Sequence, residues 1–370
     1  MGNRTQELVD IGRGEPDFHT PDHVKDAARQ AITENFTKYT PQAGIPELRE
    51  AIARKFATEN AVAVSPEHVV ASCGGKHSLE NAVRCLVHPG DEAIMLTPHW
   101  FAYPQQVRLA GGKPVLISTQ ERDGFQPDPE AIEAAVTPAT RLIILNTPCN
   151  PTGAVYSRAT LEHIARIACE RDLMVLSDEV YERILFNGAK HVSIASLNGE
   201  SAARTVTVNS VSKTHAMTGW RLGYAALPAG LAERVIEVQG ISTSAPSAVS
   251  QRAALAALTG DQSHVARMVA AYTGRRQLVL DCIDRIPGLS TIRPSGTFYC
   301  FVNIGALAGR TVQGRTIHDA DDFTALLRDE AGVSVVSGVN FGSGRHIRIS
   351  FGVANAAIEE GFGRIEQLLR

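Results

Sequence analysis

The stretch from Asn209 to Tyr224 holds the residues best suited to covalent chemistry. It follows a β-branched run and places Lys213 among small hydroxyl side chains, without an acidic neighbour. A lysine just past the end of a strand can hold the aldehyde of a cofactor as a Schiff base. Ser210, Ser212 and Arg221 surround it with groups that bind phosphate. The competing interpretation is a solvated lysine in a Ser/Thr loop, which an isolated Ser-x-Ser-Lys sequence favours.

Asp178 and Tyr181 form a second candidate group at the end of an apolar run. We expect Asp178 to emerge at the carboxyl edge of a sheet, where α/β proteins build their sites. A buried carboxylate there needs a cation. The protonated nitrogen of a pyridine ring fits, and its protonation makes the ring an electron sink. Tyr181 could hydrogen-bond the 3-oxygen of the same ring. A helix N-cap is the competing role for Asp178.

Two turns offer further polar groups. Asn150 lies in a rigid turn with prolines and a glycine and could donate to the 3-oxygen and to a substrate carboxylate, although an Asn-Pro turn alone is only a turn. Gly75 and Lys76 lie between a strand and a helix, so their backbone N–H groups form an anion site. No G-x-G-x-x-G follows that strand, so the dinucleotide-binding fingerprint is absent.

Trp100 and Arg348 complete the set. Trp100 follows a strand and could stack on a planar cofactor, with core packing as its alternative. Arg348 alternates with isoleucines, so its guanidinium could hold a carboxylate bidentately; otherwise it is an edge-strand charge. None of the twelve histidines pair at metal-ligand spacing, so we expect no metal.

Apolar runs that alternate with helical stretches predict the elements that position these residues. Their nearly continuous apolar character is typical of strands covered on both faces, so the sequence predicts an α/β fold with a mostly parallel sheet. Helices such as 76–87 and 160–171 supply the crossovers. The seven strand candidates are His68 to Ser72, Ala93 to Leu96, Pro114 to Ser118, Leu142 to Leu145, Met174 to Leu176, Thr205 to Val208 and Leu222 to Leu227.

A chain of 370 residues exceeds the size of one hydrophobic core, so we expect two domains. After Pro228 the sequence turns to alanine-rich helix, and a helix over 262–286 is long enough to bridge them. We assign residues 22–260 to a large domain and residues 1–21 and 261–370 to a small α+β domain. In the latter we expect strands at 298–304, 333–336 and 346–351, helices at 319–330 and 354–370, and a surface loop at 310–322.

Composition favours a small-molecule partner. The net charge of -3 gives no general attraction to nucleic acid or to an anionic membrane. Six scattered cysteines without metal-ligand spacing are expected to be free thiols in a reducing compartment. There is no apolar signal core and no window of about twenty apolar residues. We therefore expect a soluble, cytoplasmic protein.

These stretches together resemble the class I/II aminotransferases, which are fold type I enzymes dependent on pyridoxal 5′-phosphate (PLP), and most closely the bacterial aspartate aminotransferase subgroup. The resemblance covers nearly the whole chain, and its specificity comes from the order of the motifs. They are Gly14 to Phe18, Lys38-Tyr39, Ala43 to Arg49, Gly74 to Lys76, Asn150 to Gly153, Ser177 to Tyr181, Ser210 to Arg221, Arg293 to Gly296, and Arg348.

The resemblance implies a role for each matching residue. Lys213 would bind PLP covalently, Asp178 would pair with the pyridinium nitrogen, Tyr181 and Asn150 would hold the 3-oxygen, and Trp100 would stack on the ring. The phosphate would be bound by Gly75, Lys76, Ser210, Ser212 and Arg221, and by Tyr39 of a partner subunit, which implies a homodimer. Arg348 would bind the substrate α-carboxylate, with Gly14 and Asn150 beside it.

The implied activity is transfer of an amino group between an amino acid and a 2-oxo acid by a ping-pong mechanism, with aspartate or glutamate favoured. Lys76 would meet the distal carboxylate of that substrate. Arg13 is an alternative reader, and a neutral or aromatic side chain lined by Trp100 and Phe18 is another alternative. A PLP-dependent lyase or oxidase needs the same Lys213 and Asp178. A PLP-sensing regulator is disfavoured because no helix-turn-helix segment or basic face is present.

Overall fold

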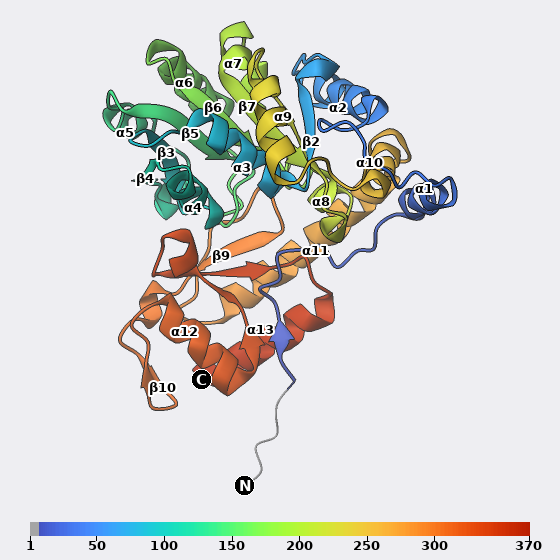
Figure 1. Ribbon diagram of the computed structural model, residues 1–370. Coiled ribbons are helices and arrows are strands. Elements are labelled where there is room, and N and C mark those ends of the chain that lie inside the picture. The colour runs from blue at the N-terminus through green and yellow to red at the C-terminus, as the bar shows by residue number, and fades with distance from the viewer. Residues whose placement is uncertain (1–6) are drawn as a thin grey trace.

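The computed structural model describes residues 7–370. Its main sheet has seven strands in the order β2-β8-β7-β6-β5-β3-β4, and only β8 runs against its neighbours (Figure 1). The strands are β2 (Val69–Ser72), β3 (Glu92–Thr97), β4 (Lys113–Ser118), β5 (Thr140–Asn146), β6 (Met174–Asp178), β7 (Thr205–Ser210) and β8 (Gly223–Ala226). All seven predicted strands and the mostly parallel α/β fold are thus confirmed.

Helices cover both faces of this sheet, which explains the continuous apolar character of its strands. Along β3, Ala93 and Met95 pack toward one set of helices, while Ile94 and Leu96 pack toward the other. The first set is α3 (Gly75–Leu86), α4 (Ala102–Leu109) and α9 (Leu231–Ser242), and the second includes α5 (Pro129–Ala134) and α6 (Arg158–Glu170). Around β2 and β8, the packing comes from α1 (Asp22–Thr33), α2 (Pro46–Glu59) and α10 (Ala248–Thr259).

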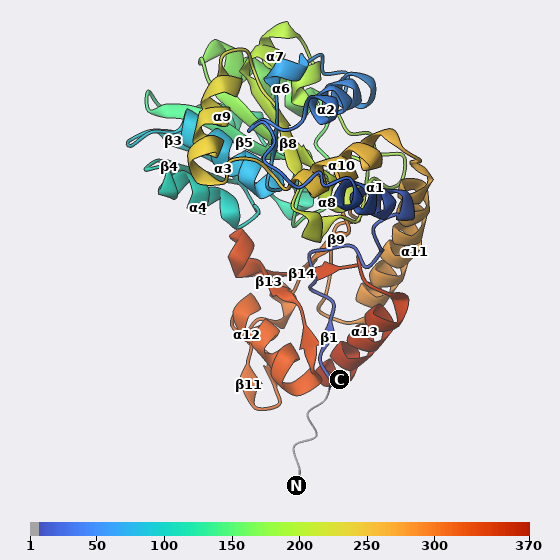
Figure 2. The same cartoon turned by 45° about the vertical axis from the view of Figure 1, so that its right-hand side comes forward.

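The remaining elements form a second group below the sheet in Figure 1. A three-stranded sheet has the order β13-β14-β9, and β1 pairs in parallel with β12. Helix α11 (Ser263–Arg285) runs alongside both groups and packs on α13 (Asn355–Leu369), as Figure 2 shows. The strands are β1 (Val9–Asp10), β9 (Tyr299–Asn303), β12 (Val333–Ser334), β13 (Val336–Ser337) and β14 (His346–Ser350).

Two predicted segments differ from the structure. The stretch 310–322, expected to be a loop, forms the hairpin β10 (Thr311–Val312) and β11 (Arg315–Thr316), and then α12 (Ala320–Leu326) begins. Its two-residue turn has positive φ at Gln313 and Gly314, which matches the right-handed twist of a hairpin. The single strand expected at 333–336 is divided into β12 and β13, because its two halves pair with different strands.

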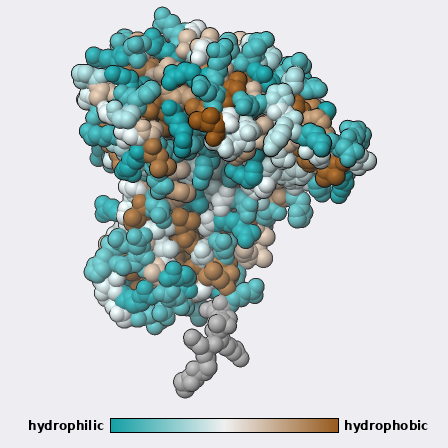
Figure 3. Space-filling model, viewed as in Figure 1, coloured by the Kyte–Doolittle hydropathy of each residue, from teal (hydrophilic) through white to brown (hydrophobic). Residues whose placement is uncertain are grey.

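Hydrophilic residues cover most of the face drawn in Figure 3, and apolar residues are scattered among them. Among residues 7–370, no helix combines the length and the apolar character needed to cross a membrane.

Candidate active site

A cavity of about 310 Å³ opens at the carboxyl ends of β5, β6 and β7, and side chains from β9 and β14 complete its wall. Its lining includes every residue predicted for the site except Tyr39: Gly14, Gly75, Lys76, Trp100, Asn150, Asp178, Tyr181, Ser210, Ser212, Lys213, Arg221 and Arg348. These residues are spread along the chain from Gly14 to Arg348. Four of them are basic, and Asp178 is the one acidic residue of the lining.

Lys213 lies in α8 (Val211–Thr214), the short helix that directly follows β7. Its Nζ donates a hydrogen bond to the backbone oxygen of Gly14, and burial lowers the pKa of its ammonium group. The amine is therefore not a solvated lysine of a surface loop. Its lowered pKa makes the uncharged, nucleophilic form more accessible.

Asp178 is the last residue of β6 and is buried. No helix begins at this position, so the alternative role as a helix N-cap is wrong. Its Oδ2 accepts from the Tyr103 hydroxyl at 2.7 Å, and its Oδ1 accepts from the Val180 backbone at 3.3 Å. Burial raises the pKa of Asp178 to about 6, against these two hydrogen bonds. The carboxylate is thus held by neutral donors in a place where a cationic partner would favour its charged form.

A second wall combines backbone N–H groups with a guanidinium. Helix α3 begins at Gly75, while the Ser210 hydroxyl accepts from the Ser212 backbone at 3.3 Å. Arg221 Nη1 donates to the Thr218 carbonyl at 2.8 Å. Gly74 has a φ of 93°, and a Cβ there would lie 2.4 Å from Arg221 Nη2. Only glycine lets this guanidinium approach the helix N-terminus, and the result suits a phosphate.

Arg348 points into the cavity from β14, the middle strand of its sheet, so it is not an edge-strand charge. Its Nη1 donates to Asn150 Oδ1 and its Nη2 to the Gly12 carbonyl, both at 3.0 Å. Its Nε is buried and has no hydrogen-bond partner in the part of the chain that the structure describes. A buried guanidinium with an unused donor is suited to binding a carboxylate.

Lys76 and Trp100 face each other across the mouth of the cavity. Lys76 Nζ lies 4.9 Å from the Trp100 ring centroid and 5.4 Å from that of Phe101. Within residues 7–370, no carboxylate lies within ion-pair distance of Lys76. Arg13, the alternative reader, does not line the cavity, and its Nε lies 3.9 Å from Asp10 Oδ2.

Three further residues of the site were missed at the sequence level. Tyr103 lies one helical turn after Trp100, a spacing that would have indicated the same face. Asn146 ends β5; its side chain accepts from the Asn150 backbone at 2.8 Å and donates to the Asp178 carbonyl at 3.0 Å. Tyr299 belongs to β9, and its hydroxyl lies 3.1 Å from that of Tyr181. No local pattern marks Tyr299.

Tyr39 is the one predicted site residue that the structure leaves outside the cavity. Its side chain is 99% exposed. In this single chain, therefore, it contacts none of the cavity residues.

Comparison with known proteins decides the family. The family model for aminotransferases of class I and II matches residues 6–365. The aspartate aminotransferase of Geobacillus stearothermophilus is 41% identical over 98% of this chain and 91% of its own. The aspartate/prephenate aminotransferase of Thermus thermophilus is 42% identical, with the same two shares. A crystal structure of the aspartate aminotransferase from Rhizobium meliloti superposes with a TM-score of 0.95 at 40% identity, covering 98% of this chain and 92% of that one.

The chain is a class I/II aminotransferase. It is therefore an enzyme that transfers amino groups, and its cofactor is PLP. The comparisons give no support to the lyase or oxidase alternative.

The cavity of the aminotransferase fits PLP in three places. Asp178 lacks a cationic partner of its own, so it suits a pyridinium nitrogen. The close approach of Arg221 to Gly74 at the start of α3 suits the phosphate. The Trp100 ring lies in the lining, where it suits one face of a planar ring.

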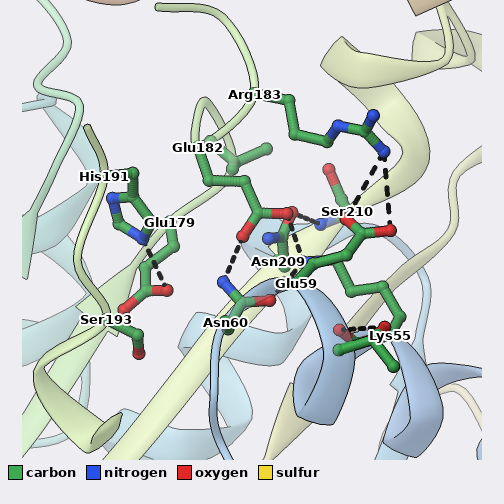
Figure 4. Close-up of polar contacts among 12 residues, drawn as sticks. Lys55, Glu59, Asn60, Glu179, Glu182, Arg183, His191, Ser193, Asn209 and Ser210 are labelled. Atoms are coloured by element: carbon green, nitrogen blue, oxygen red, sulfur yellow. Dashed lines mark hydrogen bonds and ion pairs between the residues drawn. The ribbon is translucent and has the colours of Figure 1, made fainter. Parts of the chain in front are cut away.

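Beside the cavity of the aminotransferase, a buried polar network holds the segment that carries Asp178 and Tyr181 (Figure 4). Glu182 accepts from Lys55 and from Asn60 Nδ2, and Glu179 accepts from His191 Nε2 at 2.9 Å. Ligand atoms of Glu179, Glu182 and His191 lie within 4.8 Å of one another, a spacing that a metal ion could use. Both carboxylates already have hydrogen-bond donors. Burial disfavours a charge on His191, but Glu179 raises the pKa of its imidazole, so His191 and the Lys55 ammonium supply positive charge to the two carboxylates. The network therefore needs no metal for its charge balance.

Proposed function

We propose that the enzyme transfers the amino group of a dicarboxylic amino acid, aspartate or glutamate, to a 2-oxo acid. The observation that supports this proposal most is the charge of the cavity, in which Lys76, Lys213, Arg221 and Arg348 face a single carboxylate. With Lys213 reserved for the aldehyde, three cationic groups remain for three anionic groups. These are the cofactor phosphate and the two substrate carboxylates.

The lining residues divide the tasks among them. Arg221, with Ser210, Ser212 and the backbone of Gly75 and Lys76, binds the phosphate. Tyr181 and Asn150 hold the 3-oxygen, and Trp100 covers the ring. Arg348 binds the α-carboxylate beside Gly14, using the Nε that has no hydrogen-bond partner among residues 7–370.

Lys213 and Asp178 carry the chemistry. When bound, PLP supplies an aldehyde that condenses with amines and a ring that accepts electrons from the substrate. Asp178 keeps a proton on the ring nitrogen. With substrate bound, the amine of Lys213 would take the proton from the substrate Cα, and burial favours the uncharged amine that this task needs.

We also propose that the working unit is a cytoplasmic homodimer. The exposure of Tyr39 supports this, because a tyrosine that contacts nothing in its own cavity is free to contact the phosphate site of a second copy. Six free cysteines agree with a reducing compartment.

The proposed domain division follows the pattern of strand pairing. Residues 22–260 would form the large domain, and residues 1–21 with 261–370 the small one. The pairing of β1 with β12 and the bond from the Ser350 backbone to the Ile11 carbonyl at 2.7 Å support the assignment of the first segment to the small domain. Residues 1–6 of that segment lie outside the described residues.

The substitution Lys76→Met tests the proposed preference for a dicarboxylic substrate. The variant keeps the backbone N–H that serves the phosphate and removes the charge that meets the distal carboxylate. A charge-assisted contact contributes roughly 1.5 to 3 kcal/mol, so kcat/KM for aspartate or glutamate should fall about ten- to a hundredfold, while a neutral amino acid is barely affected.

The matched control is Lys190→Met, which removes an exposed lysine that does not line the cavity. An equal loss for charged and neutral substrates in Lys76→Met would assign the lysine to the cofactor. A wild-type enzyme without an aspartate or glutamate half-reaction would contradict the proposal.

A further inference from the structure

Three histidines from distant parts of the chain meet beside the active site. His23 lies in the first turn of α1, His215 directly follows α8, and His264 lies at the start of α11, three elements that Figure 1 draws next to one another. The imidazole rings of His215 and His264 are 5.2 Å apart, and those of His23 and His264 are 6.0 Å apart. Sequence spacing gave no sign of this group.

Hydrogen bonding defines the tautomer of His264. Its Nδ1 lies 3.1 Å from the backbone oxygen of Asp261, which can only accept. The ring proton of the neutral form is therefore on Nδ1, and the lone pair of Nε2 points toward His215 Nδ1 at 3.0 Å. A histidine whose second nitrogen donates to a backbone carbonyl has the usual arrangement of a metal-binding histidine.

Both rings are in the form that metals bind. Burial lowers the pKa of His264, and it lowers that of His215 to about 3, so both imidazoles are neutral at pH 7. His23 lies beside this pair: its Nε2 is buried and has no hydrogen-bond partner among residues 7–370, but its ring is 6.0 Å from that of His264, and the three residues do not form a group with ligand atoms within 4.8 Å of one another. A neighbouring cleft of about 560 Å³ is lined by His23 and His264 and gives solvent access to them, while His215 lies behind its wall. Its charged lining is mixed, with Asp22 and Asp261 beside Lys25 and Arg267.

The separation of the two nitrogens suits a metal ion. Metal–imidazole bonds of ~2.0–2.1 Å, at angles between a right angle and the tetrahedral value, place two nitrogens roughly 2.9 to 3.4 Å apart. The observed 3.0 Å lies in this range. Rotation of the two side chains alone would direct both nitrogens at one metal ion in place of the hydrogen bond. The proton on His215 Nδ1 would then move to Nε2 of the same ring or to solvent.

We propose that His215 and His264, with His23 beside them, bind a divalent transition metal of the kind that prefers imidazole, such as Zn²⁺. His215 is two residues from Lys213, and the Thr20 hydroxyl donates to the Ala216 carbonyl at 2.8 Å in the same loop. A bound metal therefore cross-links α11 to the segment that follows α8, the helix that carries Lys213. Metal binding to the folded state also stabilises the enzyme by mass action.

Zn²⁺ titration of the PLP-loaded enzyme, after treatment with a chelator and its removal, tests the site. Competition with a chromophoric chelator should give one Zn²⁺ per chain, and saturating Zn²⁺ should raise the thermal midpoint. His264→Ala and His215→Phe should each weaken binding on the order of tenfold or more and abolish the thermal shift. His163→Ala and His318→Ala, which remove exposed histidines elsewhere, should leave both readouts unchanged.

His191→Asn separates this site from the cluster of Glu179, Glu182 and His191. Retained binding in that variant supports the proposal, whereas lost binding would assign Zn²⁺ to the other cluster and overturn it. Equal binding by wild type and His264→Ala, or no saturable binding, would also overturn it. His264 is only partly buried, so its variant decides the question if His215→Phe does not fold.

Discussion

Lys213 and Asp178 show how the interior of the protein shifts two charges in the same direction, toward the neutral form. Burial lowers the pKa of the lysine and raises that of the aspartate. For Lys213 the shift favours a nucleophile and a proton carrier. For Asp178 the shift means that a nearby cation is needed to keep the carboxylate charged, and a protonated ring nitrogen is such a cation.

Lys213→Ala should give a folded but colourless and inactive protein, because no other lysine lines the cavity except Lys76, which the mechanism reserves for substrate. Borohydride reduction of the wild-type enzyme followed by peptide mapping identifies the modified lysine. The thermal midpoint of the variant serves as the control for folding. A pyridoxyl group on a different lysine would refute the assignment.

Tyr103→Phe should move the acidic limb of the pH profile of kcat/KM to higher pH. The Tyr103 hydroxyl donates to Asp178 Oδ2 and lowers the pKa of that carboxyl, so its removal raises the pKa. Activity requires the charged carboxylate of Asp178. If its pKa is higher, this carboxylate becomes protonated at a higher pH when the solution is acidified. The matched control is Tyr272→Phe, since the Tyr272 hydroxyl is buried without a hydrogen-bond partner. An unshifted profile would show that Tyr103 has only a packing role.

At the scale of elements, α2 and the segment after β6 are joined by the ion pair of Lys55 and Glu182 (Figure 4). Burial alone would raise the pKa of Glu182, but Lys55, His191 and Asn60 lower it below its ordinary value. A depressed carboxyl pKa contributes stability above the pKa of the unfolded chain, and this contribution is lost as the pH falls through the folded value. The Glu182 carboxylate is thus charged at neutral pH, and its contact with Lys55 holds the Asp178–Tyr181 segment against α2.

Lys55→Met should lower the free energy of unfolding at pH 7 by about 3 to 5 kcal/mol, because it leaves a buried carboxylate without its cation. Urea-induced unfolding measures the loss. The loss of stability should become smaller toward acidic pH, because Glu182 is then neutralised by a proton. Lys55→Met/Glu182→Gln should recover part of the stability, because the amide carries no charge and still accepts from Asn60. If the loss of stability in Lys55→Met did not depend on pH, it would come from lost packing and not from the unpaired charge of Glu182.

For the whole molecule, the proposed dimer makes a prediction about mixed subunits. Tyr39→Ala and Arg348→Ala homodimers should each be impaired, one in PLP affinity and the other in substrate binding. If Tyr39 serves the site of the partner subunit, a heterodimer of the two variants contains one complete site and should have about half the wild-type activity. Mixing the variants after denaturation and renaturation measures this recovery. No recovery, or a fully active monomer in sedimentation, would contradict the proposal.

The sequence by itself determined the architecture and most of the site. Apolar runs reveal burial because each strand must bury both faces, and this property is local. Residues such as Asp178 and Ser210 follow those runs directly, so their meeting at one sheet edge could be inferred from strand direction alone. The order of the motifs then led to the family that the comparisons establish.

Only the tertiary structure decided the contacts between segments that lie far apart in the chain. Tyr103 reaches Asp178, Tyr299 reaches Tyr181, and His215 reaches His264 across separations that no local period encodes. The division of 333–336 into two strands likewise depends on partners elsewhere in the chain. Such contacts follow from the register of strands and the packing of helices, which are properties of the whole fold, whereas hydrophobic periodicity records only which side of each element is buried.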